Sequence, residues 1–147
     1  MTITRRDALW AMPLIAELLA SNRVAAAQTG AAAPASPRRV FRQDLPDLTM
    51  DGWEVTASLV DYAPGRVGTA HHHPGFVLAY VLSGRVVAKI SGQGEERTYS
   101  TGEMFYEQPG ATHEVSRNAS ETEPAQLLAM IFAKKGATAT TQGSAPK

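Results

Sequence analysis

The strongest constraint on the fold is a succession of short apolar segments separated by turn-forming residues. Residues 53–62 and 85–90 alternate between apolar and polar side chains, and residues 76–82 are almost all apolar. Alternation with a period of two predicts strands with one buried face, and an unbroken apolar run predicts a strand covered on both faces. Similar segments lie at 103–107, 113–117 and 126–132. Because no helical period persists between them, we expect an all-β domain.

Turn signals separate these segments, as a small antiparallel β-structure requires. They are Ala63-Pro64-Gly65, Ser83-Gly84, Ser91-Gly92-Gln93-Gly94, Thr101-Gly102 and Pro109-Gly110. The spacing favours a small antiparallel β-barrel or sandwich, and periodicity alone leaves a barrel, a jelly roll and an immunoglobulin-like sandwich open. A chain of 147 residues favours one domain. We place it at 40–133, after a Pro- and Ala-rich linker at 28–39 and before a polar, disordered tail at 134–147.

The first 27 residues are typical of an export signal. A paired Arg5-Arg6 precedes a weakly apolar stretch at 8–20, and Ala25 to Ala27 offer a small-residue cleavage site. This arrangement resembles a twin-arginine signal and predicts a periplasmic or secreted protein whose mature chain begins at Gln28. Asp7 and Glu17 are unusual in a signal. The alternative is an amphipathic N-terminal helix on a cytoplasmic protein.

The composition excludes several classes of protein. There is no cysteine, so disulfides and thiolate metal ligands are absent and any metal would be held by histidine and carboxylate. The formal net charge of +0 argues against a nucleic-acid partner. No apolar run is long enough for a membrane anchor.

The histidines are the candidate functional residues. His71, His72 and His73 are consecutive, and His113 lies forty residues further along the chain. In a strand, His71 and His73 point to one face and His72 to the other. If that face looks into a barrel, His113 can supply a third imidazole, and imidazole suits transition metals such as Fe, Ni, Cu and Zn. The alternative is a metal-free protein in which these residues are ordinary polar side chains.

At this point the sequence resembles the cupin superfamily. Its first motif, G-x5-H-x-H-x3-E-x6-G, is matched by Gly65, His71, His73 and Gly84. Its second motif, G-x5-P-x-G-x2-H-x3-N, is matched by Gly102, Gly110 and His113. The resemblance implies the double-stranded β-helix of cupins, a jelly-roll-like barrel. It also implies that His71, His73 and His113 bind a divalent transition metal (Fe, Ni, Cu, Zn or Mn).

Three positions depart from the motifs. Val77 replaces the metal-binding Glu, Gln108 replaces Pro, and Arg117 replaces Asn. Without the carboxylate, a divalent ion would keep its full charge and bind an anionic substrate more strongly.

Two residues that precede His113 are further candidates for the site. Glu107 is the candidate to replace the missing acid, as a fourth ligand or as a catalytic base. The alternatives are a solvated strand residue, or one paired with Arg97 or Arg117. Tyr106 and Gln108 are candidate hydrogen-bond donors at the site. For Tyr106, the alternative is a place in the core.

The resemblance implies several functions, because the fold does not select among them. The leading hypothesis is a quercetinase-like, metal-dependent dioxygenase, or an isomerase or lyase, that acts on an enolate, phenolate or carboxylate. The alternative is a non-catalytic protein that binds or senses a small molecule. The resemblance also implies a homodimer that pairs through an edge strand, for which 40–45 and 126–132 are the candidates.

Overall fold

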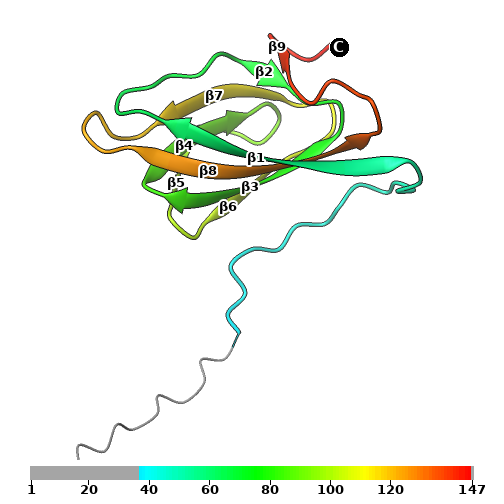
Figure 1. Cartoon of the computed structure of the whole chain (residues 1–147), viewed down its shortest axis with the longest axis horizontal. Coiled ribbons are helices and arrows are strands. Elements are labelled where there is room, and N and C mark those ends of the chain that lie inside the picture. The colour runs from blue at the N-terminus through cyan, green and yellow to red at the C-terminus, as the bar shows by residue number, and fades with distance from the viewer. Residues whose placement is uncertain (1–36, 147) are drawn as a thin grey trace, which may run out of the picture. The chain divides into compact units, whose positions relative to one another are not determined.

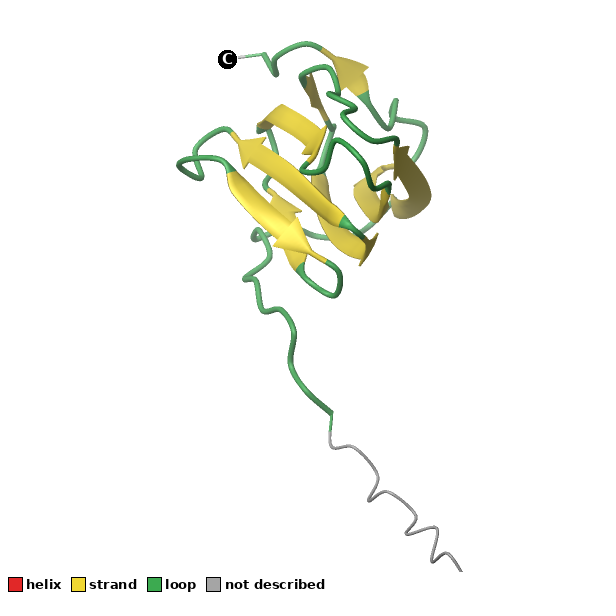
Figure 2. Cartoon of the chain, turned by 90° about the vertical axis from the view of Figure 1, so that its left-hand side faces the viewer, coloured by secondary structure: helices red, strands yellow, loops and turns green. Residues whose placement is uncertain are grey.

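The structure is a computed structural model that describes residues 37–146 and contains nine β-strands in that range. Figure 2 shows only strands and loops in this part of the chain. The strands are β1 (Trp53–Tyr62), β2 (His71–His72), β3 (Phe76–Ser83), β4 (Arg85–Ile90), β5 (Arg97–Ser100), β6 (Met104–Glu107), β7 (Thr112–Asn118), β8 (Ala125–Lys134) and β9 (Thr141–Gln142). Within the described range, no helix is long and apolar enough to cross a membrane.

The strands form two antiparallel sheets (Figure 1). One sheet has the order β1-β8-β3-β6, and the other has the order β5-β4-β7-β2-β9. Consecutive strands often lie in different sheets, so the chain crosses repeatedly between the two, as in a jelly roll. The expected all-β class and antiparallel barrel are confirmed.

The longest alternating segment forms the longest ladder of the first sheet. All ten residues of β1 pair with β8 without a break in register, from Trp53 opposite Lys134 to Tyr62 opposite Ala125. Successive side chains point to opposite faces of a sheet. Ser58, Val60 and Tyr62 therefore face the interior, where they line a cavity, while the odd-numbered residues face outward.

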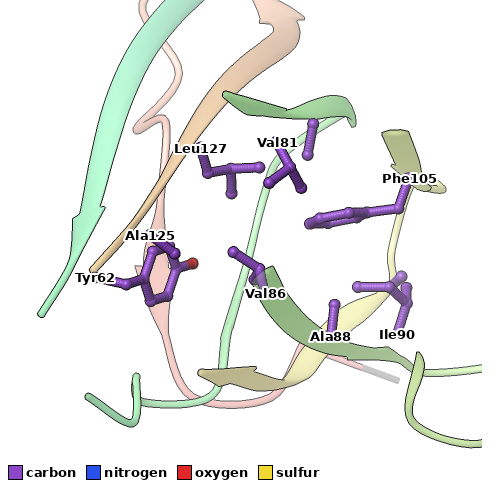
Figure 3. Packing of buried hydrophobic residues seen from close by; sticks show 10 residues of the cluster. Tyr62, Val81, Val86, Ala88, Ile90, Phe105, Ala125 and Leu127 are labelled. Carbon is purple, nitrogen blue, oxygen red and sulfur yellow. The ribbon is translucent and has the colours of Figure 1, made fainter. Parts of the chain in front are cut away.

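The apolar core lies between the two sheets. Figure 3 shows Val81 and Phe105 of one sheet pointing toward Val86 and Ile90 of the other. These four side chains are at most 4% exposed, and each completely buried aliphatic or aromatic side chain contributes roughly 1.5–3 kcal/mol to folding. Tyr62, Ala79 and Leu127 belong both to this core and to the cavity wall. The core therefore fixes one side of the cavity.

Two glycines are required where the backbone turns or approaches itself closely. Gly84, in the turn between β3 and β4, has a φ of +71°, and a Cβ there would lie 2.6 Å from the carbonyl oxygen of Pro124. A Cβ on Gly75 would lie 2.0 Å from the carbonyl oxygen of Phe132. Any side chain at these positions would displace β3 or β8.

The expected strands are present, His71 and His72 form the short strand β2 that the histidine pattern assumes, and the structure adds two strands that were not expected, namely β5 and β9. Both proposed edge strands are wrong. Residues 126–132 lie in β8, which is flanked by β1 and β3, and residues 40–45 form no strand. The expected tail at 134–147 begins inside β8 and contains β9. The export signal and the linker up to residue 36 lie outside the described residues.

Candidate metal centre

A cavity of about 290 Å³ opens between the two sheets. Its apolar wall comes from the first sheet and consists of Val60, Ala79, Leu127, Ala129 and Ile131. The titratable and hydroxyl groups of its lining come from both sheets and the loops: Ser58, Tyr62, Arg66, Thr69, His71, His73, Glu107, His113, Ser116 and Thr140. The cavity can therefore hold a small molecule with an apolar body and a charged or hydrogen-bonding end.

Strand pairing brings the three candidate histidines together. His71 of β2 lies directly opposite His113 of β7 in the antiparallel ladder, and their ring centroids are 4.9 Å apart. His73 follows β2 by one residue, and its ring centroid is 5.1 Å from that of His71. All three rings line the cavity, whereas His72 does not.

Backbone carbonyls orient two of the rings. The Nδ1 of His71 lies 2.9 Å from the carbonyl oxygen of Thr69, and the Nδ1 of His73 lies 2.7 Å from that of Ala139. A carbonyl oxygen only accepts, so each Nδ1 carries the proton and donates it. Each Nε2 then carries a lone pair, which is the form of histidine that binds a metal.

Glu107 is at the site, and its position explains the loss of the acid at position 77. It lies at the end of β6 directly opposite Val77 of β3, and cross-strand partners point to the same face of a sheet. The carboxylate therefore occupies the site from the neighbouring strand. It is 5% exposed, its Oε1 lies 3.2 Å from the Nδ1 of His113, and its Oε2 lies 3.8 Å from the Nε2 of His73.

Burial and charge set the protonation of these groups. Burial by itself would raise the pKa of Glu107, but the hydrogen bond from His113 and the charges of the nearby histidines outweigh it and lower that pKa. Burial lowers the pKa of His71, although its hydrogen bond to Thr69 acts in the opposite direction. Both shifts favour a carboxylate beside a neutral imidazole, as metal binding requires.

Two buried atoms of this cluster have no hydrogen-bond partner, the Nε2 of His113 and the Oε2 of Glu107. Buried polar atoms are almost always satisfied, so an unpaired nitrogen lone pair beside an unpaired carboxylate oxygen fits a cation ligand. Among residues 37–146, however, no three His, Asp or Glu side chains are arranged with their ligand atoms close enough together to hold a metal ion as they stand. One oxygen of Glu107 is instead bonded to His113. The donor types, tautomers and unpaired atoms fit a transition metal.

The structure places the remaining candidates away from the cavity. Tyr106 lies on the outer face of the first sheet, with its ring centroid 6.1 Å from that of Phe76, and it does not line the cavity. The side-chain nitrogen of Gln108 donates to the carbonyl oxygen of Ser91 in a turn. Arg117 pairs with Glu96 at 3.1 Å and not with Glu107.

Several site residues had no signal in the sequence. The C-terminal segment supplies the carbonyl of Ala139 to His73 and the side chains of Thr140 and Gln142 to the cavity wall. Arg66 lies at the cavity with its guanidinium 5.3 Å from the centre of the Tyr62 ring. These residues come from a polar stretch and a loop, which show no pattern that would have identified them.

Solved structures with the same fold support the architecture. An uncharacterised protein with a double-stranded β-helix domain from Klebsiella pneumoniae is 22% identical with a TM-score of 0.50, covering 63% of this chain and 76% of its own. Oxalate decarboxylase from Lactobacillus farciminis is 18% identical with a TM-score of 0.52, covering 60% of this chain and 26% of its own. The DMSP lyase DddQ from Ruegeria pomeroyi is 20% identical with a TM-score of 0.52, covering 60% of this chain and 42% of its own.

These similarities concern the fold, and this chain spans only part of the two enzymes. No curated protein matches the sequence. The model of the Cupin domain family matches residues 58–131, which begin in β1, end in β8 and include all four histidines and Glu107. With the family's glycine and histidine spacing and its paired antiparallel sheets both present, the chain belongs to the cupin family.

Proposed function

We propose that this cupin binds a divalent transition metal through His71, His73 and His113, with Glu107 beside them, and acts on a small anionic substrate. One observation carries the proposal: the unpaired Nε2 of His113 and Oε2 of Glu107 lie buried next to two histidines whose Nδ1 atoms are already bonded. Such an arrangement leaves only nitrogen lone pairs and carboxylate oxygens toward the cavity. A cation held by the nitrogen lone pairs is the partner that fits them, and the carboxylate beside it offsets part of its charge.

The residues around the cavity favour a substrate with a negatively charged oxygen. Three neutral imidazoles and one carboxylate cancel only part of the charge of a divalent ion, so an anionic ligand supplies the rest. Among residues 37–146, Arg66 is the only Lys or Arg side chain that lines the cavity. It would bind a second polar or anionic group of the substrate near the Tyr62 ring.

Each residue then has a distinct task. A bound ion would act as a Lewis acid on the substrate oxygen. His71 and His73 are held in the ligating tautomer by Thr69 and Ala139. Glu107 orients His113 through one oxygen, and its other oxygen is positioned to accept a substrate proton. The apolar wall of the first sheet limits water around the substrate.

We assign the reaction to the dioxygenase-like class. An isomerase or lyase reaction on the same type of substrate is the other possibility within this function. A proton acceptor beside a site for a chelating oxygen suits substrates that form an enolate. Two proteins of similar fold are enzymes by name, an oxalate decarboxylase and a DMSP lyase. The fold can therefore hold an active site, which supports an enzymatic function for this chain. A binding or sensing protein without turnover is the competing function.

Metal content provides the first test. The chain purified from its host of origin should contain about one transition-metal ion per molecule, because three histidines and an acid are available. His73→Ala should lose most of it, and His72→Ala, which alters a histidine outside the cavity, should retain it. Near-zero metal in both the native chain and His73→Ala would contradict the proposal.

Turnover provides the second test. Oxygen uptake is measured with the metal-loaded chain and a panel of 1,3-diketones and flavonols, with Glu107→Gln as the variant. Uptake that depends on substrate and falls at least tenfold in the variant supports an enzyme with Glu107 as base. Tight binding of a substrate without uptake or product would identify the chain as a binding protein.

A further inference from the structure

Two buried hydroxyl groups meet in the cavity wall, one from each sheet. Tyr62 is the last residue of β1 and Ser116 lies in β7, and their side-chain oxygens are 2.7 Å apart. Both side chains are buried and both line the cavity. Figure 3 shows the ring of Tyr62 directed into the interior, toward Val86. The pair therefore presents polar atoms inside the molecule, separate from the histidine cluster.

A β-bulge places Ser116 on the same face of β7 as His113. Residues three apart on a regular strand point to opposite faces. In the β4–β7 ladder, His113 lies opposite Ile90 and Ser116 lies opposite Ala88, so three steps along β7 match two steps along β4. The extra residue of β7 turns both side chains to the interior, as bulges beside functional sites often do. Two steps along β4 separate the two positions by about 7 Å.

The hydroxyl pair has one hydrogen more than it uses. Each hydroxyl carries one hydrogen and can accept two hydrogen bonds. Among the described residues, the bond between Tyr62 and Ser116 is the only hydrogen bond of either side chain. Whichever hydroxyl donates in that bond, the other keeps a hydrogen without an acceptor in this part of the protein. Buried donors are almost always satisfied, so this hydrogen is available to a molecule in the cavity.

The donor at this end of the cavity is neutral. Burial raises the pKa of the Tyr62 phenol above its ordinary value of 10.0 and outweighs the opposite effects of Ser116 and Arg66, so the hydroxyl keeps its proton. Arg66 lies over the ring of Tyr62, but its side chain is exposed and its guanidinium donates to the carbonyl of Asp61. The buried donor of this end is therefore a hydroxyl, which suits a neutral carbonyl or ether oxygen.

Small side chains leave room between this pair and the histidines. Ser58, Ala129 and Ala79 are direct neighbours across β1, β8 and β3, and all three line the cavity. Along these strands, their row lies between the row that ends at Glu107 and the row that contains Tyr62. A ligand that reaches from one end to the other can therefore place its apolar part over this row.

We propose that the Tyr62–Ser116 pair is a second recognition point, which donates a hydrogen bond to a neutral oxygen of the substrate. This inference rests on the proposed function, because the anionic oxygen of the same substrate would lie at the histidines. The substrate class is then a small molecule with an enolate, phenolate or carboxylate at one end and a carbonyl or ether oxygen about 7 Å away. A compound without the second oxygen leaves the buried donor unpaired and is discriminated against.

Two 1,3-diketones that differ in one group test this specificity. In 7-methoxyheptane-2,4-dione, an ether oxygen replaces a methylene group of nonane-2,4-dione. Calorimetry on the metal-loaded full chain gives the ratio of their affinities. The double variant Tyr62→Phe and Ser116→Ala removes both hydroxyls, so this ratio should shift against the ether by about tenfold or more relative to the native chain. Each single variant keeps one hydroxyl hydrogen and should shift the ratio less.

A matched control lies outside the cavity. Tyr99→Phe with Ser100→Ala makes the same two changes on β5 and should leave the ratio at its native value. The metal content of the Tyr62 and Ser116 variants should also remain native, because the histidines are unchanged. A crystal structure of the native complex provides a measurement that needs no variant: the ether oxygen should lie within hydrogen-bond distance of one of the two hydroxyls.

The outcomes separate this inference from the proposed function. Binding of both diketones with the same affinity ratio in the native chain and the folded double variant would overturn the inference alone, as would an ether oxygen located away from both hydroxyls. Failure of both diketones to bind the metal-loaded chain would overturn the proposed substrate type, and the inference with it.

Discussion

At the scale of single residues, Glu107 and Val77 show how a sheet can supply a functional group from the neighbouring strand. Their Cα atoms are direct partners in the β3–β6 ladder, and both side chains are almost completely buried. A carboxylate on either strand would therefore point toward the same histidines. The charge at the site depends on one acid at this pair of positions and not on which strand carries it.

An exchange of the two side chains tests this equivalence. Glu107→Val should weaken metal binding by roughly 10- to 100-fold, because an oriented acid beside a ligating histidine is lost. Adding Val77→Glu to that variant should restore affinity to within about tenfold of the native value. Affinity is measured by competition with a chelating dye, and Glu96→Val, at an exposed acid, is the control.

Two outcomes would contradict this equivalence. One is unchanged affinity in Glu107→Val, which would remove Glu107 from the site. The other is a folded double variant with no recovery, which would show that the two positions are not interchangeable. Val77→Glu alone should destabilise the fold by about 3 kcal/mol or more, since it buries a second acid next to the first.

The neutral state of His71 makes the metal-free protein sensitive to acid. Its pKa lies below the reference value of 6.5 because it is buried, so the unfolded chain takes up this proton first as the pH falls. The free energy of unfolding should therefore decrease as the pH falls below 6.5, by at most about 1.4 kcal/mol per pH unit for this group. The decrease ends at the lower pKa of the folded state.

Urea denaturation at about pH 7.5 and about pH 5.5 measures this effect. His71→Gln should lose less stability between the two conditions than the native chain does. His72→Gln, outside the cavity, should behave like the native chain. An equal loss in His71→Gln would mean that His71 contributes nothing to the pH dependence.

At the scale of elements, the C-terminal segment completes the site. β9 pairs with β2, the carbonyls of Ala139 and Gly143 accept hydrogen bonds from His73 and His72, and the amide of Gly143 donates to Ala70. These bonds use backbone atoms, so no single side-chain substitution removes them. The segment fixes the tautomer of His73 and the position of β2.

A truncation tests this role of the segment. Removing residues 137–147 should lower metal affinity tenfold or more, because His73 loses the acceptor for its Nδ1 proton. Removing only residues 146 and 147 keeps those contacts and is the control. Nitrogen NMR of the histidine rings reports the tautomer without metal, so the test also applies to the empty protein. Native affinity together with an unchanged His73 tautomer in the truncated chain would contradict this role.

The same elements show what the sequence can predict. The long alternating strands were predictable, with β1 at Trp53–Tyr62 and β4 at Arg85–Ile90 both located to the residue. β9 is two residues long and exists only because β2 pairs with it, so no local pattern identifies it. Likewise, the histidine spacing predicted the cluster, whereas the place of Glu107 depends on the β3–β6 register, which the sequence does not show.

At the scale of the whole molecule, the paired arginines near the N-terminus bear on where the site would acquire its metal. The twin-arginine route carries folded proteins, so a site closed by β9 and the C-terminal segment would be loaded before export. Export therefore stays a prediction that links the first residues of the chain to the candidate metal centre. The predicted mature protein begins at Gln28 and still contains every residue of the site.

Conservative replacement of the arginine pair tests this prediction. In the host of origin, the native chain should be recovered outside the cytoplasm, with Gln28 as its first residue by mass spectrometry. The double variant Arg5→Lys and Arg6→Lys keeps the charge but removes the paired guanidinium groups, so it should remain inside the cytoplasm at full length. Full-length native protein in the cytoplasm would favour the amphipathic-helix interpretation, while export that persists in the double variant would indicate a route that reads positive charge alone.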